Sequence, residues 1–269
     1  MTTHARGEAA AKSPAEIYDT LFVPALFRHW SAIVAGEARI GPGDRVIDVA
    51  CGTGVLALAA LDRAGPGGTV VGLDPNADML GVARRKSSRI DWRDGRAEAL
   101  PFPGRTFDAA VSQFGLMFFA DPAGGLREML RVLKPGGRLA VAVCGPLADS
   151  PGYAALAALL EKLFGGRVAD AFRAPFAFGD RDALRSLCAE AGLGHARIDQ
   201  HGGKVRFASI ASLISTERAC VWTLGGLLDE ARFGRLMGEA EKSLQPFRQG
   251  DGSVVFDMPA LIISASRDG

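Results

Sequence analysis

The chain has 269 residues, of which 48% are hydrophobic, 23% charged and 7% aromatic, a composition that is typical of a globular protein and argues against intrinsic disorder. The 31 Lys and Arg residues balance the 30 Asp and Glu residues and leave a net charge of +1, so the basic surface of a dedicated duplex-binding protein is not expected. The four cysteines are far apart and form no CxxC pair, which argues against a disulfide framework and a metal site.

Glycine stands out, with 34 residues, about 13% of the chain against about 7% in an average protein. The glycines follow no collagen-like period, so we expect them at specific turns. Residues 1–12 lack the apolar segment of a secretory signal, and no stretch approaches the roughly 18 apolar residues of a membrane span. The sequence therefore predicts a cytoplasmic protein without a transmembrane segment, and we expect no nucleic-acid partner.

The N-terminal region is predicted to be helical after a disordered lead over residues 1–12. Residues 13–16, Ser-Pro-Ala-Glu, fit a capping box with proline at the first helical position. Apolar residues follow as far as Val34 and indicate one or two helices, which we expect Pro24 to interrupt because proline removes a backbone donor.

Strands and helices alternate between residues 45 and 144, a pattern that predicts a mostly parallel sheet covered on both faces. Beyond residue 145 the pattern is less regular and mainly helical, with a break at Gly225-Gly226. The expected strands are 45–49, 69–73, 90–92, 107–112, 138–144, 196–199, 205–208 and 258–265, and the expected helices are 55–63, 75–86, 122–133, 152–164, 181–191 and most of 211–244.

The strongest chemical signal is the segment 48–54, Asp-Val-Ala-Cys-Gly-Thr-Gly, between the first strand and its helix. Glycines there let a ligand approach backbone N–H groups, and a helix N-terminus favours an anionic group. Asp74, about twenty residues further on, can accept hydrogen bonds from ribose hydroxyls. We therefore expect an adenosine ligand. The spacing Gly52-x-Gly54-x-x-Ala57 also fits a dinucleotide-binding turn, as in a nicotinamide dehydrogenase, and Asp74 before Pro75 fits a helix cap.

Five segments in family order resemble the class I S-adenosylmethionine-dependent methyltransferases, most closely the branch of the ubiquinone and menaquinone biosynthesis methyltransferases. They are residues 46–54, 72–74, 95–102, 107–111 and 131–139. The resemblance implies an α/β fold: a Rossmann-like three-layer sandwich with a seven-stranded, mostly parallel sheet and a final antiparallel strand, plus helical lid segments. It also implies S-adenosylmethionine as cofactor and S-adenosylhomocysteine as product.

The resemblance also implies roles for individual residues. Asp48 would lie near the methionine amino group, Asp74 would hold the ribose hydroxyls, and Gln113 would face the sulfonium and the acceptor. Arg96 stands where relatives commonly carry an acidic residue, so the adenine contact there would fall to backbone groups or Glu98. The expected cofactor-binding residues are Asp48, Ala50, Gly52, Gly54, Asp74, Pro75, Met79, Ala97, Glu98, Gln113 and Tyr18.

Tyr18 belongs to this set because Ile17-Tyr18-Asp19 resembles a Tyr-Asp pair in this branch, where the tyrosine closes over the cofactor. The alternative is an amphipathic helix that packs its tyrosine on the core. The resemblance further implies an N-terminal helical lid over residues 1–40 and a methyltransferase domain over 41–269. Within that domain, residues 146–180 and 210–256 would be substrate-covering insertions.

The expected function is methyl transfer to a small-molecule acceptor by in-line displacement, with catalysis mainly through proximity and orientation. The alternative is a cofactor-binding protein without transfer activity. We assign no catalytic residue, since the candidate bases by type, Tyr18, His29, Asp121 and His201, each have an ordinary structural interpretation; the oligomeric state is left as monomer or homodimer. An apolar or aromatic acceptor is favoured by Phe114, Leu116, Met117, Phe118, Phe119, Phe164, Phe172, Phe176 and Phe178.

Overall fold

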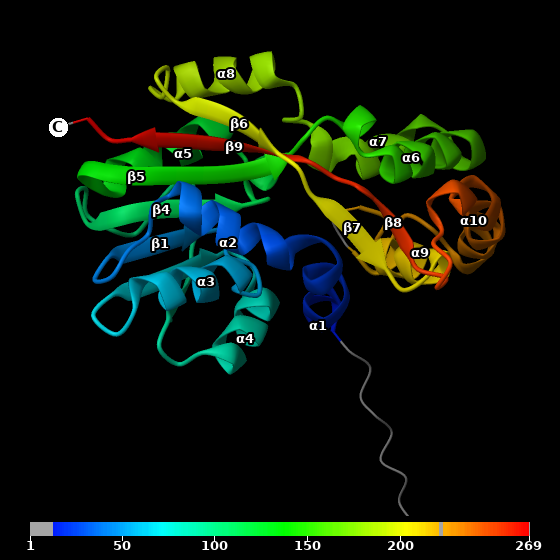
Figure 1. The fold of residues 1–269 in the computed structure, drawn as a ribbon, viewed down its shortest axis with the longest axis horizontal. Coiled ribbons are helices and arrows are strands. Elements are labelled where there is room, and N and C mark those ends of the chain that lie inside the picture. The colour runs from blue at the N-terminus through cyan, green and yellow to red at the C-terminus, as the bar shows by residue number, and fades with distance from the viewer. Residues whose placement is uncertain (1–12, 221–222, 269) are drawn as a thin grey trace, which may run out of the picture.

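The computed structural model describes residues 13–220 and 223–268, so the lead predicted over residues 1–12 lies outside the described part. Its main sheet has seven strands in the order β3-β2-β1-β4-β5-β9-β6 (Figure 1). β9 runs antiparallel to both of its neighbours, and the strands from β3 to β5 pair in parallel, which confirms the predicted fold class. The strands are β1 Arg45–Val49, β2 Thr69–Asp74, β3 Asp91–Asp94, β4 Phe107–Gln113, β5 Leu133–Cys144, β6 Arg197–His201 and β9 Ala260–Ser266.

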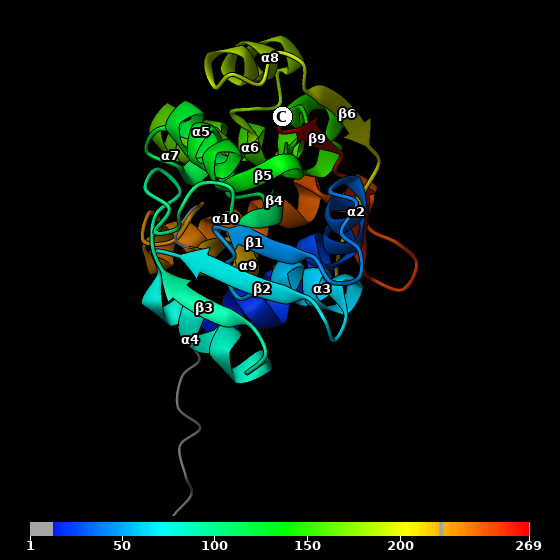
Figure 2. The same cartoon turned by 90° about the vertical axis from the view of Figure 1, so that its left-hand side faces the viewer.

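Helices cover both faces of this sheet (Figure 2). α2 (Arg28–Glu37) and α3 (Val55–Ala64) lie on one face, and α5 (Pro122–Val132) and α8 (Arg181–Glu190) lie on the other, while α4 (Ala77–Lys86) packs against β2 and β3. The strand side chains alternate accordingly. In β1, Val46 joins the core under α2 and α3, whereas Ile47 joins the core under α5 and α8.

The N-terminal helices differ from the prediction. The capping box is present, with Ser13 Oγ accepting from Glu16 N at 3.2 Å and the Glu16 carboxylate accepting from Ser13 N at 3.0 Å. However, Pro24 does not interrupt the helix: α1 (Pro14–Ile17), a π-helical segment (Tyr18–Phe27) and α2 follow one another without a break. The wider π turn bonds residue i to residue i−5, so the chain passes Pro24 without the α-helical contact that its ring would disturb. We call residues 13–27 the strap.

A second group of elements lies beyond the carboxyl ends of the parallel strands (Figure 1). A ribbon connects it to the main sheet, because β7 follows β6 directly and β8 leads directly into β9. Of its elements, α7 and β8 were not predicted. We call this group the cap; it consists of α6 (Pro151–Phe164), α7 (Gly166–Arg173), β7 (Lys204–Phe207), α9 (Ile210–Ala219), α10 (Glu230–Ser243) and β8 (Val254–Asp257).

The cap has its own apolar core, and the strap is part of it. Phe22 and Leu26 of the strap pack in the same buried cluster as Leu156 of α6, Leu213 of α9 and Phe256 of β8. Among the described helices, none has the length and apolar character needed to cross a membrane. The strap and cap therefore form one layer over the carboxyl edge of the sheet.

Candidate functional site

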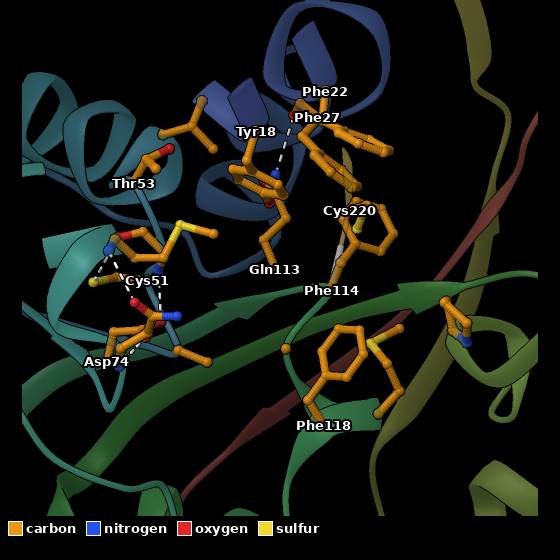
Figure 3. A pocket seen from close by; sticks show the side chains of 18 of the residues that line it. Tyr18, Phe22, Phe27, Cys51, Thr53, Asp74, Gln113, Phe114, Phe118 and Cys220 are labelled. Carbon is orange, nitrogen blue, oxygen red and sulfur yellow. Dashed lines mark hydrogen bonds between the residues drawn. The ribbon is translucent and has the colours of Figure 1, made fainter. Parts of the chain in front are cut away.

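A cavity of about 640 Å³ lies between the carboxyl edge of the main sheet, the strap and the cap (Figure 3). Its floor is built from the loops that follow β1, β2 and β4. β1 lies between β2 and β4, so the strand order changes direction at β1. Ligands of open α/β sheets bind outside the carboxyl ends of the strands at this point.

The cavity brings together ten of the eleven predicted cofactor-binding residues. The exception is Gly54, which is absent from the cavity wall. The ten that line it are Tyr18, Asp48, Ala50, Gly52, Asp74, Pro75, Met79, Ala97, Glu98 and Gln113.

Gly54 serves the packing beneath the cavity. It caps the N-terminus of α3 with φ +86°, a left-handed conformation that suits glycine. A Cβ atom there would lie 2.4 Å from the ring of Trp92, and one at Gly72 would lie 2.5 Å from the same ring. Gly54 and Gly72 therefore leave the space that the Trp92 ring of β3 occupies.

Asp74 is held by two backbone donors. Gly52 N and Asn76 N each donate to one of its carboxylate oxygens at 2.8 Å. The helix cap is Asn76, which accepts from the N–H groups of Asp78 and Met79, so the interpretation of Asp74 as the cap of α4 is wrong. Burial raises the pKa of Asp74, and the two N–H groups oppose that shift. Each oxygen keeps a lone pair, which allows the carboxylate to accept ligand hydroxyls as well.

Asp48 is the most deeply buried carboxylate on the floor. It is 1% exposed, and neither carboxylate oxygen has a hydrogen bond of normal geometry to a described residue. Burial raises the pKa of Asp48 well above its usual range; the backbone N–H of Ala57 opposes this shift, and the charge of Asp74 adds to it. Burying an unpaired, ionised carboxylate costs several kcal/mol of desolvation free energy. A hydrogen-bond donor or a cation on a ligand would offset this cost at Asp48.

Gln113 connects the floor to the strap. Its side-chain Nε2 donates to the carbonyl of Phe27 at 3.1 Å (Figure 3), whereas its Oε1 is buried without a partner among the described residues. The rings of Tyr18 and Phe22 stack at 5.9 Å, and those of Tyr18 and Phe27 at 5.6 Å. Phe27 in turn contacts Phe114 after β4 at 5.3 Å. An aromatic series thus forms the wall over the floor.

Ion pairs fasten the outer side of the strap to α4. Arg85 contacts Glu16 at 2.9 Å, and Lys86 pairs with Asp19. Lys86 Nζ also donates to the carbonyl of Thr53 at 2.9 Å, which brings the strap, α4 and the glycine turn together.

Glu98 and Arg96 lie in the segment 95–102, which follows β3. Glu98 Oε1 accepts from Ala120 N at 2.6 Å, and Arg96 Nε lies 3.7 Å from Glu98 Oε2. The Arg96 side chain is 64% exposed. The acidic group at this corner of the cavity is thus Glu98, which the sequence offered as the substitute for the residue that Arg96 replaces.

The predicted acceptor-side residues divide into wall and core. Leu116 is fully buried in the core under α5, and Phe164 and Phe178 pack against the two cores. The others line the cavity: Phe114, Met117, Phe118, Phe119, Phe172 and Phe176.

Sequence reasoning missed the buried polar groups of the cap wall, above all Glu217. Glu217 lies on α9, is 2% exposed and lines the cavity with Tyr153 of α6. The signal was available: Ile210, Leu213, Ile214 and Glu217 follow the i, i+3, i+4, i+7 spacing of one helix face. A carboxylate within an apolar stripe is rarely buried without a reason.

Three of the four candidate bases have the ordinary structural role. His29 packs its ring on Trp30 with centroids 4.5 Å apart. His201 Nε2 lies 3.7 Å from a Glu37 oxygen, and Asp121 caps α5 by accepting from Gly124 N at 2.8 Å. None of these three lines the cavity in the described part of the chain, whereas Tyr18 does.

The charge of the wall discriminates between ligands. Among the described lining residues, Arg96 is the only basic one, against five acidic ones. Such a surface opposes the anionic pyrophosphate of a dinucleotide and favours a ligand with positive charge. The acidic residues are Asp48, Asp74, Asp78, Glu98 and Glu217.

Comparisons with known proteins identify the family of the chain. The family model described as the ubiE/COQ5 methyltransferase family matches residues 15–156. A ubiquinone/menaquinone biosynthesis C-methyltransferase of Stenotrophomonas maltophilia is 42% identical over 132 residues, which are 47% of this chain and 52% of that protein. A demethylmenaquinone methyltransferase of Renibacterium salmoninarum is 44% identical over 115 residues, 43% of this chain and 47% of that protein. The chain thus spans about half the length of the curated relatives it matches.

Solved structures share the fold at low identity. The YcgJ protein of Bacillus subtilis has a TM-score of 0.60 at 17% identity, covering 90% of this chain and 99% of its own. The [4+2]-cyclase SpnF has a TM-score of 0.53 at 23% identity, covering 90% of this chain and 81% of its own. These likenesses support the architecture alone, since one fold hosts different reactions.

Proposed function

Because the chain belongs to the ubiE/COQ5 methyltransferase family, we propose that it transfers a methyl group from S-adenosylmethionine to a small apolar or aromatic molecule. The observation that carries this proposal is the unpartnered, buried carboxylate of Asp48 on the floor of an acidic cavity. The amino group of an amino-acid moiety would supply the donors that Asp48 lacks. A dinucleotide offers no such group and is opposed by the charge of the wall.

The other predicted cofactor residues fit the remaining parts of this ligand. Asp74 would hold the ribose hydroxyls, with Pro75 and Met79 beside the adenine and Ala97 and Glu98 at its edge. Ala50, Gly52 and Gly54 shape the turn around the methionine portion. These roles rest on the family resemblance and on the shared cavity wall.

The chain's own contribution to the reaction would be alignment and exclusion of water. S-adenosylmethionine supplies a methyl group on a sulfonium, which is already an activated leaving group. Gln113 and Tyr18 would face this group from the floor and the strap, and the aromatic wall would keep the site dry. Holding two reactants in line is worth several kcal/mol without any further chemistry.

The acceptor would lie under the cap. Phe172 and Phe176 of the segment 146–180 and Glu217 and Cys220 of the segment 210–256 line that side of the cavity, which supports both segments as substrate-covering insertions and the strap as the lid. The names of the curated relatives make quinone-related acceptors the first to try. The cytoplasmic location and the monomeric or homodimeric state stay predictions.

The second candidate is a protein that binds S-adenosylmethionine without transferring its methyl group. It is favoured by one observation: a [4+2]-cyclase shares the fold, so the architecture alone does not fix the reaction.

Two measurements test the proposal. Calorimetry should show binding of S-adenosylhomocysteine and none of NAD; the reverse result would exclude a methyltransferase. Transfer of tritiated methyl from S-adenosylmethionine to demethylmenaquinol (the reduced form of demethylmenaquinone), 1-naphthol and 1,4-dihydroxynaphthalene then tests the activity. Tight cofactor binding with no labelled product from any acceptor would favour the second candidate.

A further inference from the structure

Glu217 is the buried acidic group on the cap side of the cavity. It lies near the end of α9, on the same helix face as Ile210 and Leu213. Its Oε2 atom is buried and has no hydrogen bond of normal geometry to any described residue. The nearby Thr223 hydroxyl donates at 3.0 Å to the backbone carbonyl of Glu217 and also favours the ionised form of its side chain.

The titratable groups around Glu217 come from three elements. Tyr153 belongs to α6, Cys144 ends β5, and Cys220 follows α9; all three line the same cavity. Burial, followed by the charge of Glu217, raises the pKa of Tyr153 well above its usual range, and burial raises that of Cys144 to about 12. Burial raises the pKa of Glu217 itself to about 7. Tyr153 and Cys144 thus keep their protons near neutral pH, whereas Glu217 exchanges its own.

A structural role does not account for this arrangement. A carboxylate buried for stability would be paired, as Asp74 is by two N–H groups. Glu217 instead shares the wall with the hydroxyls of Tyr153 and Thr223, which favour its ionised form, yet the buried Tyr153 hydroxyl, like Glu217 Oε2, has no hydrogen bond of normal geometry within the described residues. Two unsatisfied polar atoms at one end of an aromatic pocket indicate that a ligand completes their hydrogen bonds.

We propose, resting on the methyl-transfer function above, that Glu217 is the general base that receives the proton of the acceptor. The acceptor is then an uncharged aromatic molecule that presents a dissociable O–H group to α9. In the step, the acceptor atom gains the methyl group as the sulfur–methyl bond breaks, and the electron pair of that bond stays on sulfur as a neutral thioether. The proton released by the acceptor passes to Glu217 Oε2 and leaves to solvent with the product.

Tyr153 is a positioning residue in this scheme. Its ring is fixed edge-on against Phe172 at 5.7 Å and Phe256 at 5.0 Å. Its hydroxyl stabilises the ionised form of Glu217, and its removal should move the titration of Glu217 upward.

The test is the pH dependence of methyl transfer by the full chain, from about pH 5 to about pH 9, with whichever of demethylmenaquinol (the reduced quinone, which carries the O–H group), 1-naphthol and 1,4-dihydroxynaphthalene reacts fastest. The wild-type rate should rise through the Glu217 pKa of about 7. Glu217→Gln should lower kcat by about 10²- to 10⁴-fold and remove the inflection. Tyr153→Phe should keep the inflection and shift it to higher pH.

Two controls separate this assignment from misfolding and from failure of the proposed function. S-adenosylhomocysteine should bind Glu217→Gln as tightly as wild type, and Glu230→Gln, an exposed cap carboxylate paired with Arg218, should react at the wild-type rate. Wild-type transfer together with undiminished transfer and an unchanged inflection in Glu217→Gln would overturn the assignment alone. No transfer by the wild type would overturn the proposed function.

Discussion

The two sides of the cavity hold their buried carboxylates in different ways. On the floor, Asp74 receives two backbone N–H groups from the turns after β1 and β2. Under the cap, the Tyr153 and Thr223 side chains favour the ionised form of Glu217, and its Oε2 has no hydrogen bond of normal geometry within the described residues. Backbone turns fix a group through a short local sequence, whereas a side-chain pocket draws on residues far apart in the chain. If the proposed function holds, the difference suits a floor that holds the cofactor and a cap side that selects the acceptor.

The largest expected effect tests the rigidity of the floor. Gly54→Ala places a methyl group 2.4 Å from Trp92 at φ +86°. Overpacking and the left-handed conformation together should lower the free energy of unfolding by about 2–5 kcal/mol, measured by urea denaturation. Gly81→Ala is the matched control, because Gly81 lies inside α4 with open space around it. It should be neutral or stabilise by up to about 1 kcal/mol. An equal loss in both variants would contradict the claim that Gly54 is needed to make room for the Trp92 ring.

The next effect measures the stability lost by burying Glu217. Its pKa is raised from 4.5 to about 7 in the fold, so the protonated form is favoured there. The stability present below pH 4.5 is lost as pH rises to about 7, amounting to about 3 kcal/mol at higher pH. Glu217→Gln should therefore raise the free energy of unfolding by about that amount near pH 8, and by little near pH 4.5.

The exposed ion pair between Arg218 and Glu230 in the cap provides the control for this measurement of the free energy of unfolding. Glu230→Gln removes a carboxylate whose pKa is lowered by the hydrogen bond from Arg218, so it should bring no gain at alkaline pH. Equal stability of wild type and Glu217→Gln near pH 8 would show that the Glu217 carboxylate is satisfied in solution.

A smaller effect tests the ligand contact of the floor. Asp74→Ala should weaken S-adenosylhomocysteine binding by about 1–3 kcal/mol, the scale of a hydrogen bond to a charged group, measured by calorimetry. Asp91→Ala, at the exposed start of β3, should bind as wild type does. Unchanged affinity in Asp74→Ala would remove the ribose role.

The smallest effect concerns the strap. Arg85→Ala breaks an ion pair with Glu16 whose side chains are 61% and 40% exposed. Such a pair contributes less than about 1 kcal/mol, so thermal stability should change little and less still at high salt. A large loss of cofactor affinity would show that the strap depends on its surface charges more than on Tyr18 and Phe22.

The difference between the floor and the cap side also explains which parts of the site could be predicted from the sequence. The floor was predictable because glycines, an acid at a strand end and alternating strands are local signals, and they singled out Asp48 and Asp74, which both line the cavity. The strap was half predictable: the capping box at Ser13 is local, but the path through Pro24 depends on π-helical turns that only packing on the cap selects. Glu217 was missed because its neighbours Tyr153 and Cys144 are more than sixty residues away in the chain.

The ribbon between sheet and cap has a consequence for insertions and deletions in the chain. β6 passes into β7 and β8 into β9, so α9 and α10 are spliced into the bend of one long hairpin. Insertions or deletions there leave the register of β9 between β5 and β6 untouched. The junction is tight, since a Cβ at Gly203 would lie 2.2 Å from Trp30. A change in the length of the segment between β7 and β8 therefore leaves the main sheet intact, provided that position 203 stays a glycine.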